Sequence, residues 1–339
     1  MNVFNSCGTV EAVKGVAMKI VIPGGTGHLG RVLGRALAEQ GNEVVVLTRR
    51  EARPEPGTRH VRWDGRGPGP WTAEVDGSDV VLNLAGRSVN CRYTEANLRE
   101  MLNSRVDSAR VVGGAIARAA RPPRVWLQMS TATIYAHTFA APNDETTGVI
   151  GGDEPDVPAY WSTSVDIAKA WEREQRLAAT PETRKVALRT AMVMSPEPGG
   201  ALAMLLRLTR LGLGGPVAGG GQYMSWIHED DLIDAIGFLI GHEELSGPVN
   251  LAAPEPLPYR DFLRALRSAA GVPVGLPATK WMAELGAFVL RSDTELLLKS
   301  RRVIPGRLRE AGFEFRYPEW PAAAEDLVRR SREALRPVG

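Results

Sequence analysis

The chain has 339 residues, of which 44% are hydrophobic and 24% charged, and its formal net charge is +2. This length suits one compact, two-lobed molecule, and the composition is typical of a globular protein. No apolar run approaches the roughly 20 residues of a membrane-spanning helix, so we expect no membrane association. The small net charge, with arginines spread along the chain, argues against a nucleic-acid partner.

The cysteines and the N-terminal segment bear on location. Cys7 and Cys91 lie far apart without a CxxC pattern, which predicts neither a disulfide framework nor a metal site and fits a reducing cytoplasm. Residues 1–17 lack the basic start and apolar core of a signal peptide. We interpret them as an N-terminal extension or the result of an upstream start, outside the fold.

Short apolar runs, mostly bounded by Gly, Pro or charged residues, predict the buried strands of a parallel sheet. These runs are Met18–Pro23, Glu43–Thr48, Asp79–Leu84, Arg124–Ser130 and Lys185–Thr190. Helical patterns lie between them, the clearest from Leu29 to Leu37, with Gly41 at its end. The alternation predicts an α/β fold, a Rossmann-type doubly wound parallel sheet over residues 18–190.

The pattern changes after residue 191, where connections rich in Pro and Gly separate further helices. The predicted helices are Asp230–Ile240, Tyr259–Ala270 and Lys280–Leu290. We predict a smaller C-terminal α/β substrate lobe over residues 191–335, from which one strand near 248–252 returns to the main sheet.

The segment after the first predicted strand contains glycines spaced G-x-x-G-x-x-G. Glycine permits a sharp turn, close approach of the backbone to pyrophosphate and tight packing of helix on strand, and the helix N-terminus then faces the phosphates. Glycine-rich turns are common, so the pattern gains weight only from its place between a strand and a helix. It predicts a dinucleotide-binding turn made of Gly24, Gly25, Thr26, Gly27, His28, Leu29 and Gly30.

The residues that end the second strand indicate which dinucleotide is bound. An acidic residue here would hold the ribose hydroxyls of NAD, but Thr48, Arg49 and Arg50 occupy the place. A guanidinium offers a 2′-phosphate two charge-assisted hydrogen bonds, which favours NADP. The alternative is that both arginines are ordinary surface charges.

Two further segments are predicted to line the cofactor. Trp63 and Asp64, after a third strand, are candidates for the adenine pocket, although Trp63 is equally suited to packing at its rim. After the fourth strand, small side chains let the cofactor lie across the edge of the sheet, at Leu84, Ala85 and Gly86.

Several blocks together closely resemble one family: GGTGHLG, VVVLTR, NLAG, SRVDSARVV, LRTAMVM, LGLGGPVAGGGQYMSWIHEDDL and RVIPGRLREAGFEFRYP. The chain from Met18 to about Val328 resembles the NADP-dependent epimerase family of atypical extended short-chain dehydrogenases. The C-terminal lobe of that family is an otherwise uncharacterised, DUF1731-like domain. Its members are expected to have a Rossmann fold, and a homodimer is expected only by analogy.

The resemblance also implies roles for individual residues of the cofactor site. Thr48 and Arg49 would bind the 2′-phosphate, and Leu84 and Ala85 would pass under the cofactor. Side contacts would come from Glu100 and Arg105, and Met192 would lie near the nicotinamide. Two alternatives stay open: Arg105 in a buried ion pair with Glu100 or Asp107, and Met192 as packing.

The wider superfamily uses a Tyr-x-x-x-Lys pair for acid–base chemistry and a Ser or Thr hydroxyl that orients the substrate oxygen. Thr131 matches the hydroxyl residue. The pair itself is missing, because its expected places hold Ser164 and Ala168. Tyr135 is the first substitute proton carrier, but a phenol with a pKa near 10 needs a nearby cation to act as a base. Lys169 would supply that cation unless it points to solvent, and Tyr135 is as well suited to core packing.

One feature of the substrate lobe argues against a sugar-nucleotide substrate. Relatives that act on sugar nucleotides usually place an Arg-Asp pair two residues after the glutamine of a G-x-Q segment, where this chain has Met224 and Ser225. Methionine does not anchor a diphosphate. Trp226 and His228 fit a structural role at the start of a helix.

Two functions follow from the sequence. The first is an NADP(H)-binding, epimerase-like oxidoreductase that acts on an unidentified small carbonyl or hydroxyl compound. The alternative is a non-catalytic NADP(H)-binding redox sensor or regulatory protein, which the missing Tyr-Lys pair favours.

Overall fold

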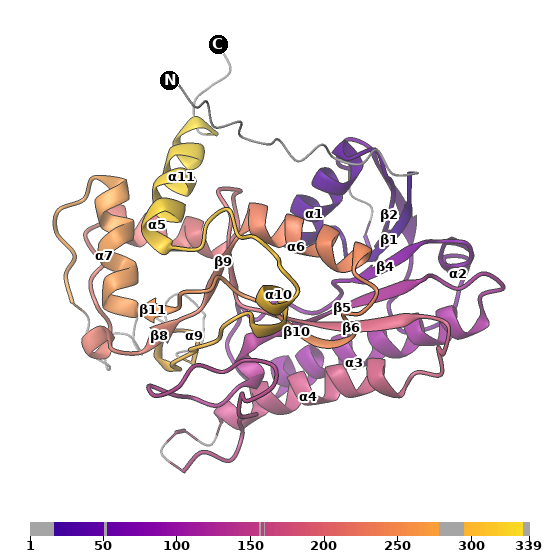
Figure 1. Cartoon of the computed structure of the whole chain (residues 1–339), viewed down its shortest axis with the longest axis horizontal. Coiled ribbons are helices and arrows are strands. Elements are labelled where there is room, and N and C mark those ends of the chain that lie inside the picture. Colours follow the sequence, from indigo (N-terminus) through magenta and orange to yellow (C-terminus); the bar gives the residue numbers. More distant parts are fainter. Residues whose placement is uncertain (1–16, 51–52, 156, 159, 278–294, 335–339) are drawn as a thin grey trace, which may run out of the picture.

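A computed structural model describes residues 17–50, 53–155, 157, 158, 160–277 and 295–334. Its centre is a seven-stranded sheet in the order β10-β6-β5-β4-β1-β2-β3, and every neighbouring pair in it is parallel (Figure 1). The strands are β1 Lys19–Pro23, β2 Glu43–Thr48, β3 Thr58–Arg62, β4 Val80–Asn83, β5 Val125–Thr131, β6 Arg184–Thr190 and β10 Gly247–Leu251. This order, which reverses direction at β1, confirms the predicted Rossmann fold.

Helices cover both faces of the sheet. Figure 1 shows α1 and α6 on one face and α3 and α4 on the other. Their bounds are α1 His28–Glu39, α3 Glu95–Arg118, α4 Trp161–Leu177 and α6 Glu229–Gly241, and α2 is a short helix at Thr72–Val75. Because both faces are covered, β4 is buried along its whole length, as the continuous apolar runs in the sequence require.

The five strands predicted by residue range all form, and each end lies within one residue of its prediction. The predicted helices Asp230–Ile240 and Tyr259–Ala270 correspond to α6 and to α7 Tyr259–Ala270. The predicted helix Lys280–Leu290 and residues 1–16 of the predicted extension lie outside the described residues.

The C-terminal part of the chain forms a second hydrophobic cluster beside the sheet. Its helices are α5 Ala201–Arg210, α7 and α11 Trp320–Glu333, with the rings of Phe262 and Trp320 stacked 4.0 Å apart. Two small sheets join it to the main sheet: β7 Met192–Met194 pairs with β9 Trp226–His228, and β8 Tyr223–Met224 pairs with β11 Leu257–Pro258. The short helices α9 Glu295–Leu298 and α10 Gly306–Glu310 follow.

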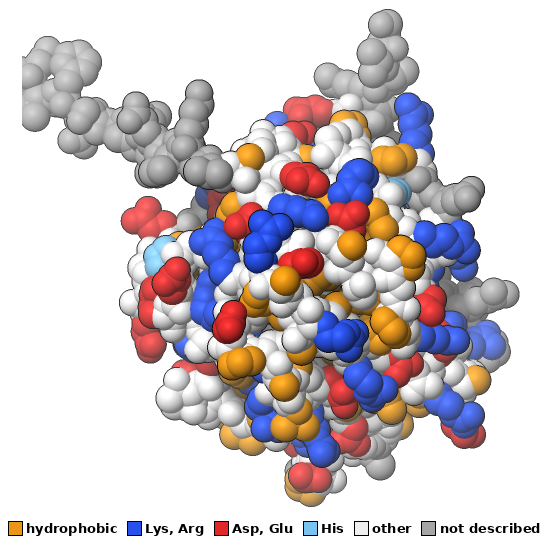
Figure 2. All heavy atoms as spheres, turned by 90° about the vertical axis from the view of Figure 1, so that its right-hand side faces the viewer, with side chains coloured by type: hydrophobic (Ala, Val, Ile, Leu, Met, Phe, Trp, Pro, Cys, Tyr) orange, Lys and Arg blue, Asp and Glu red, His pale blue; other side chains and the backbone are white. Residues whose placement is uncertain are grey.

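The surface carries side chains of both charges, as expected from a net charge of +2. Figure 2 shows basic and acidic side chains mixed across the face that is on the right-hand side of Figure 1. Within the described part of the chain, no helix has the length and apolar character needed to cross a membrane. Among those same residues, no group of three or more His, Cys, Asp and Glu side chains is placed to hold a metal ion.

Candidate functional site

The glycine turn after β1 is held by very close backbone contacts. Gly24 has φ +79°, and a Cβ atom there would lie 2.6 Å from the Cα of Ala85. A Cβ on Gly30 would lie 2.4 Å from the backbone of Gly25, beneath the turn. Glycine is therefore needed at both places. Gly27 precedes the first turn of α1, and no side chain caps the helix there. An uncapped helix N-terminus is able to bind an anion through its amides.

A cavity of about 350 Å³, which we call the dinucleotide groove, opens beside this turn. Most of the residues predicted to bind the cofactor line it together: Gly24, Thr26, Gly27, Thr48, Arg49, Asp64, Leu84, Ala85, Gly86 and Glu100. Gly25 and Gly30 are buried under the turn instead. His28 faces Gly200, since a Cβ on that glycine would lie 2.6 Å from the imidazole Nε2 atom.

The end of β2 presents the predicted phosphate ligand. The hydroxyl of Thr48 donates to the carbonyl of Arg50 at 2.8 Å and accepts from its N–H at 3.3 Å, which closes a tight turn around Arg49. Arg49 is exposed at the groove. The turn thus fixes the backbone of Arg49 at the rim of the groove.

Asp64 and Trp63 form the far wall of the groove. The carboxylate of Asp64 accepts hydrogen bonds from the N–H groups of Arg66 and Gly67, which lower the pKa of Asp64 and keep it ionised. Trp63 is only 6% exposed and meets Trp71 edge-on, with ring centroids 5.4 Å apart. Trp63 therefore packs in the core and lines the groove at once.

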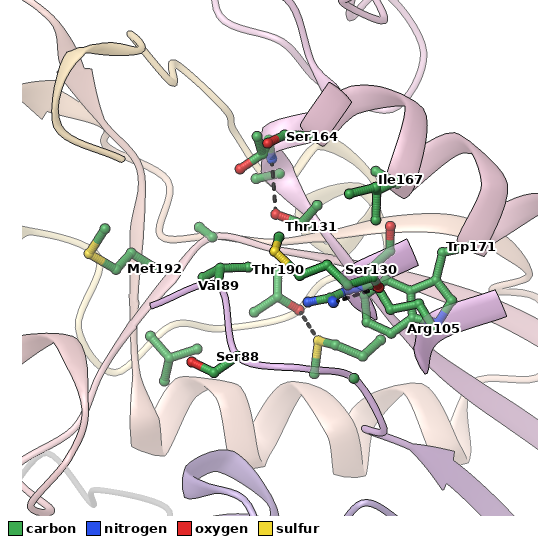
Figure 3. A pocket seen from close by; sticks show the side chains of 18 of the residues that line it. Ser88, Val89, Arg105, Ser130, Thr131, Ser164, Ile167, Trp171, Thr190 and Met192 are labelled. Carbon is green, nitrogen blue, oxygen red and sulfur yellow. Dashed lines mark hydrogen bonds between the residues drawn. The ribbon is translucent and has the colours of Figure 1, made fainter. Parts of the chain in front are cut away.

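A second cavity, of about 410 Å³, adjoins the groove, and we call it the reaction cavity. Leu84 and Gly86 line both cavities, so the two meet at the end of β4. Besides Leu84 and Gly86, four predicted site residues line the reaction cavity: Leu29, Arg105, Thr131 and Met192. Figure 3 shows its wall, with Thr131 and Ser164 at one side and Arg105 beside Trp171.

Thr131 lies at the carboxyl end of β5. Its Oγ1 atom accepts a hydrogen bond from the N–H of Thr133 at 3.2 Å and so caps the short 3₁₀ helix Ala132–Ile134. This contact fixes the oxygen at the wall of the reaction cavity.

Arg105 projects from α3 into the reaction cavity. The predicted alternative, an ion pair with Glu100 or Asp107, is not formed: Glu100 lies 3.9 Å from Arg66, and Asp107 lies 3.1 Å from Arg110. The Arg105 guanidinium instead lies over the ring of Trp171, 4.9 Å from its centroid, and donates to the carbonyl of Met101 at 3.0 Å. Burial lowers the pKa of Arg105 to about 10.

The geometry argues against the predicted catalytic role of Tyr135. Its ring is 2% exposed and lines neither cavity. Its hydroxyl donates to Asn250 Oδ1 at 3.0 Å and accepts from Arg189 Nη1 at 2.9 Å, and burial raises its pKa despite the nearby arginine. Lys169, the proposed activating cation, is exposed. Tyr135 directly follows the 3₁₀ helix, and its ring packs in a buried cluster with Ile134 and Val165.

Arg189 and Glu172 complete a buried network behind the cavity. Arg189 makes two hydrogen bonds to the carboxylate of Glu172, each 2.9 Å, and Ser130 donates to the same carboxylate at 2.7 Å. The pair joins β6 to α4 and orients the hydroxyl of Tyr135. We assign these residues a structural role.

The residues of the reaction cavity that were not among the predicted site residues include Ser164, Glu295 and Arg301. Ser164 occupies the expected tyrosine place, and its hydroxyl donates to Glu295 Oε2 at 2.6 Å. Glu295 and Arg301 come from the far C-terminal part of the chain, so no local pattern connects them to α4. The only signal was the presence of charged residues beside the family-specific RVIPGRL block.

Trp226 and His228 have the structural surroundings expected of them. Trp226 is fully buried, and His228 Nδ1 accepts from the N–H of Asp230 at 3.0 Å to cap α6. The imidazole stacks on Tyr317 with centroids 3.9 Å apart.

Comparison with known proteins identifies the family. The model of the NAD dependent epimerase/dehydratase family matches residues 20–252, and that of a domain of unknown function, DUF1731, matches residues 278–327. The epimerase family protein SDR39U1 of Bos taurus is 30% identical over 315 residues, which cover 92% of this chain and 100% of the relative. The epimerase family protein YfhF of Bacillus subtilis is 28% identical over 314 residues, covering 92% and 98%.

Two solved structures extend the likeness to the fold. The human epimerase family protein SDR39U1 (isoform 2) with NADPH superposes with a TM-score of 0.78 at 29% identity, covering 92% of this chain and 99% of that one. A nucleoside-diphosphate sugar epimerase from Corynebacterium glutamicum gives 0.71 at 27% identity, covering 93% and 59%. This chain therefore belongs to the NAD dependent epimerase/dehydratase family, as its sequence blocks predicted.

Proposed function

We propose that the protein is an NADP(H)-binding, epimerase-like oxidoreductase that acts on a small carbonyl or hydroxyl compound. NADPH is the cofactor bound in the human SDR39U1 structure, and the dinucleotide groove of this chain has residues that fit it. The amides at the start of α1 would bind the pyrophosphate, and Arg49 with Thr48 would bind the 2′-phosphate. The cofactor supplies a hydride at its nicotinamide.

The observation that carries the proposal is the junction of the two cavities. A dinucleotide in the groove would pass Leu84 and Gly86 and bring its reactive end to the reaction cavity. Thr131 lies on that cavity's wall, where its hydroxyl would orient a substrate oxygen. Apolar side chains form much of the remaining wall, which suits a small organic molecule: Met129, Trp171, Met192 and Met224.

The same wall supports a substrate without a diphosphate. Met224 is 5% exposed and lines the cavity at the place where sugar-nucleotide enzymes carry an arginine. A thioether donates no hydrogen bond to a phosphate oxygen. We therefore favour a small carbonyl or hydroxyl compound over a sugar nucleotide.

The test is a screen of aldehydes, ketones, alcohols and sugar nucleotides for NADP(H)-linked turnover, followed by Thr131→Ala. Loss of an orienting hydroxyl should lower kcat by about 100-fold, and Thr131→Ser should keep most of it. The control is Thr138→Ala, since Thr138 lines neither cavity. Turnover that is unchanged in Thr131→Ala would remove Thr131 from the reaction.

The alternative, a non-catalytic NADP(H)-binding sensor, rests on Ser164 and Ala168 in the places of the tyrosine and the lysine. It predicts tight NADPH binding without turnover of any compound in the screen, and a protein partner whose affinity differs between NADP⁺ and NADPH. A cytoplasmic location and a homodimer remain predictions from the sequence.

A further inference from the structure

One side-chain contact joins α4 to the C-terminal segment at the wall of the reaction cavity. Ser164 Oγ donates to Glu295 Oε2 at 2.6 Å, and both residues line the cavity. This distance lies in the short range of a charge-assisted O–H···O⁻ hydrogen bond, with the carboxylate as acceptor. Ser164 also holds the place at which the sequence comparison with the superfamily expects the tyrosine, and the contact faces the cavity in which the proposed substrate would bind.

Glu295 is buried among charges that compensate its own. Its side chain is 1% exposed, and Oε1 lies 3.7 Å from Lys299 Nζ and 3.9 Å from Arg301 Nη2. Burial of a lone carboxylate would be very costly, and two cations within 4 Å offset that cost. The arrangement keeps a carboxylate at the cavity wall.

The same cluster is tied to the segment that carries Thr131. Lys299 Nζ donates to the carbonyl of Thr133 at 3.0 Å, and Arg301 Nε donates to Thr133 Oγ1 at 3.1 Å. The backbone N–H of Thr133 in turn donates to Thr131 Oγ1. The carboxylate, the Ser164 hydroxyl and the Thr131 hydroxyl are thus held relative to one another by direct contacts.

We propose that Ser164 and Glu295 are the proton-transfer pair of this protein, in place of the missing tyrosine and lysine. The inference rests on the proposed oxidoreductase function. Serine alone is too weak an acid or base to serve, but a hydroxyl bonded to a carboxylate relays a proton to it. The C-terminal domain, through Glu295, thereby supplies a catalytic group to the Rossmann domain.

The step is balanced in both directions. In oxidation, the substrate O–H gives its proton to Ser164 Oγ while the proton of Ser164 moves to Glu295 Oε2. The C–H bond of the same carbon breaks, and its hydrogen leaves with the electron pair as a hydride to NADP⁺. The products are a carbonyl compound, NADPH and a protonated Glu295, which later releases its proton to water. In reduction every transfer runs backwards, with Thr131 holding the substrate oxygen in each case.

The kinetic test compares Glu295→Gln, Ser164→Ala and Ser164→Thr with the wild type on the best compound from the NADP(H) screen. Glu295→Gln and Ser164→Ala should each lower kcat by about 100-fold or more, and Ser164→Thr, which keeps the hydroxyl, should restore much of it. In the oxidation direction the wild-type rate should fall as Glu295 becomes protonated in acid, and Glu295→Gln should lack this fall. Asp166→Asn, an exposed carboxylate on α4, is the matched control and should behave as the wild type.

A second readout needs no turnover. The infrared difference spectrum between the wild type and Glu295→Gln, both with NADP⁺, should show a carboxylate band that shifts in Ser164→Ala. The NADPH affinity of all variants, measured by calorimetry, should stay near the wild-type value, because the substitutions leave unchanged the residues of the dinucleotide groove that would bind the pyrophosphate and the 2′-phosphate.

The outcomes separate the two proposals. Variants that turn over substrate as fast as the wild type, with its pH profile, overturn the proton-transfer pair and leave the oxidoreductase function standing. An unshifted carboxylate band also overturns the pair, whatever the kinetics. A wild type that binds NADPH but turns over nothing in the screen overturns the oxidoreductase function, and the pair's catalytic role with it. A lower melting temperature with unchanged kcat would show that the contact only fastens α9 to α4.

Discussion

Arg105 is largely enclosed although it carries a charge, and replacing it with methionine tests why it is there. Its guanidinium lines the reaction cavity and stacks on Trp171, and among the described residues it has no carboxylate partner within ion-pair distance. A charge that is held without such a partner destabilises the protein until an anionic ligand arrives. We therefore expect Arg105→Met to stabilise the ligand-free protein and to weaken NADPH binding.

The magnitude follows from the structure. Burial lowers the pKa of Arg105 from 12.5 to about 10, and at about 1.4 kcal/mol per unit this costs about 3 kcal/mol. Methionine loses the hydrogen bond to Met101, worth about 1 kcal/mol, and keeps a contact with the Trp171 ring through its sulfur. The free energy of unfolding should rise by about 2 kcal/mol.

The assay is denaturant unfolding of the wild type and Arg105→Met, each with and without saturating NADPH. NADPH should stabilise the wild type more than the variant, because a ligand that binds the native state adds stability in proportion to the logarithm of its affinity. Arg110→Met is the matched control on α3, since Arg110 is exposed and pairs with Asp107. If Arg105→Met unfolds more easily than the wild type without ligand, Arg105 is a structural residue and the reasoning is wrong.

Four further predictions concern single side chains. Arg49→Ala should weaken NADPH binding about 10- to 100-fold, which is the contribution of one or two charged hydrogen bonds, and should leave NADH binding unchanged. Calorimetry with Arg53→Ala as the control checks this, and equal losses of affinity for both cofactors would contradict it. Gly30→Ala should destabilise the protein by about 1–3 kcal/mol, because the added Cβ meets backbone at 2.4 Å, and a melting temperature equal to that of the wild type would disprove that contact. Tyr135→Phe should cost about 1–3 kcal/mol of stability while NADPH affinity and kcat stay the same, and a loss of kcat alone would return Tyr135 to the reaction. Burial lowers the pKa of His228 to about 4, so His228 takes up a proton in the unfolded chain before it does so in the folded protein as the pH falls. The difference in unfolding free energy between the wild type and His228→Asn should therefore shrink by about 3 kcal/mol from pH 6.5 to 4. A difference that stays constant over this pH range in melting experiments would refute this.

The sheet and the cofactor turn were predictable because their signals are local. Strand β2 is an unbroken apolar run whose boundaries matched the structure, and the glycines at 24, 27 and 30 lie within a single turn. The positive φ of Gly24 and the contact of Gly30 with the backbone of Gly25 are local requirements for glycine. Residues that act through the backbone within a few positions can therefore be identified from sequence.

The reaction cavity was only partly predictable because its walls come from distant segments. Thr131 follows a strand and could be placed, but the orientation of Tyr135 depends on Arg189 and Asn250, which approach from other strands. Glu295 reaches Ser164 across 131 positions of sequence. Neither hydrophobic period nor residue spacing carries information over such a distance.

The two cavities are lined by different segments of the chain, and this has a consequence for how the protein can evolve. Among the described residues, those that line the dinucleotide groove lie between 24 and 108, whereas the reaction cavity also includes Glu295 and Arg301 from the C-terminal segment. Substitutions in that segment can change which compound fits while the cofactor site stays intact. With the substrate bound as proposed, this segment is the part of the chain in which substrate choice can change at little risk to cofactor binding.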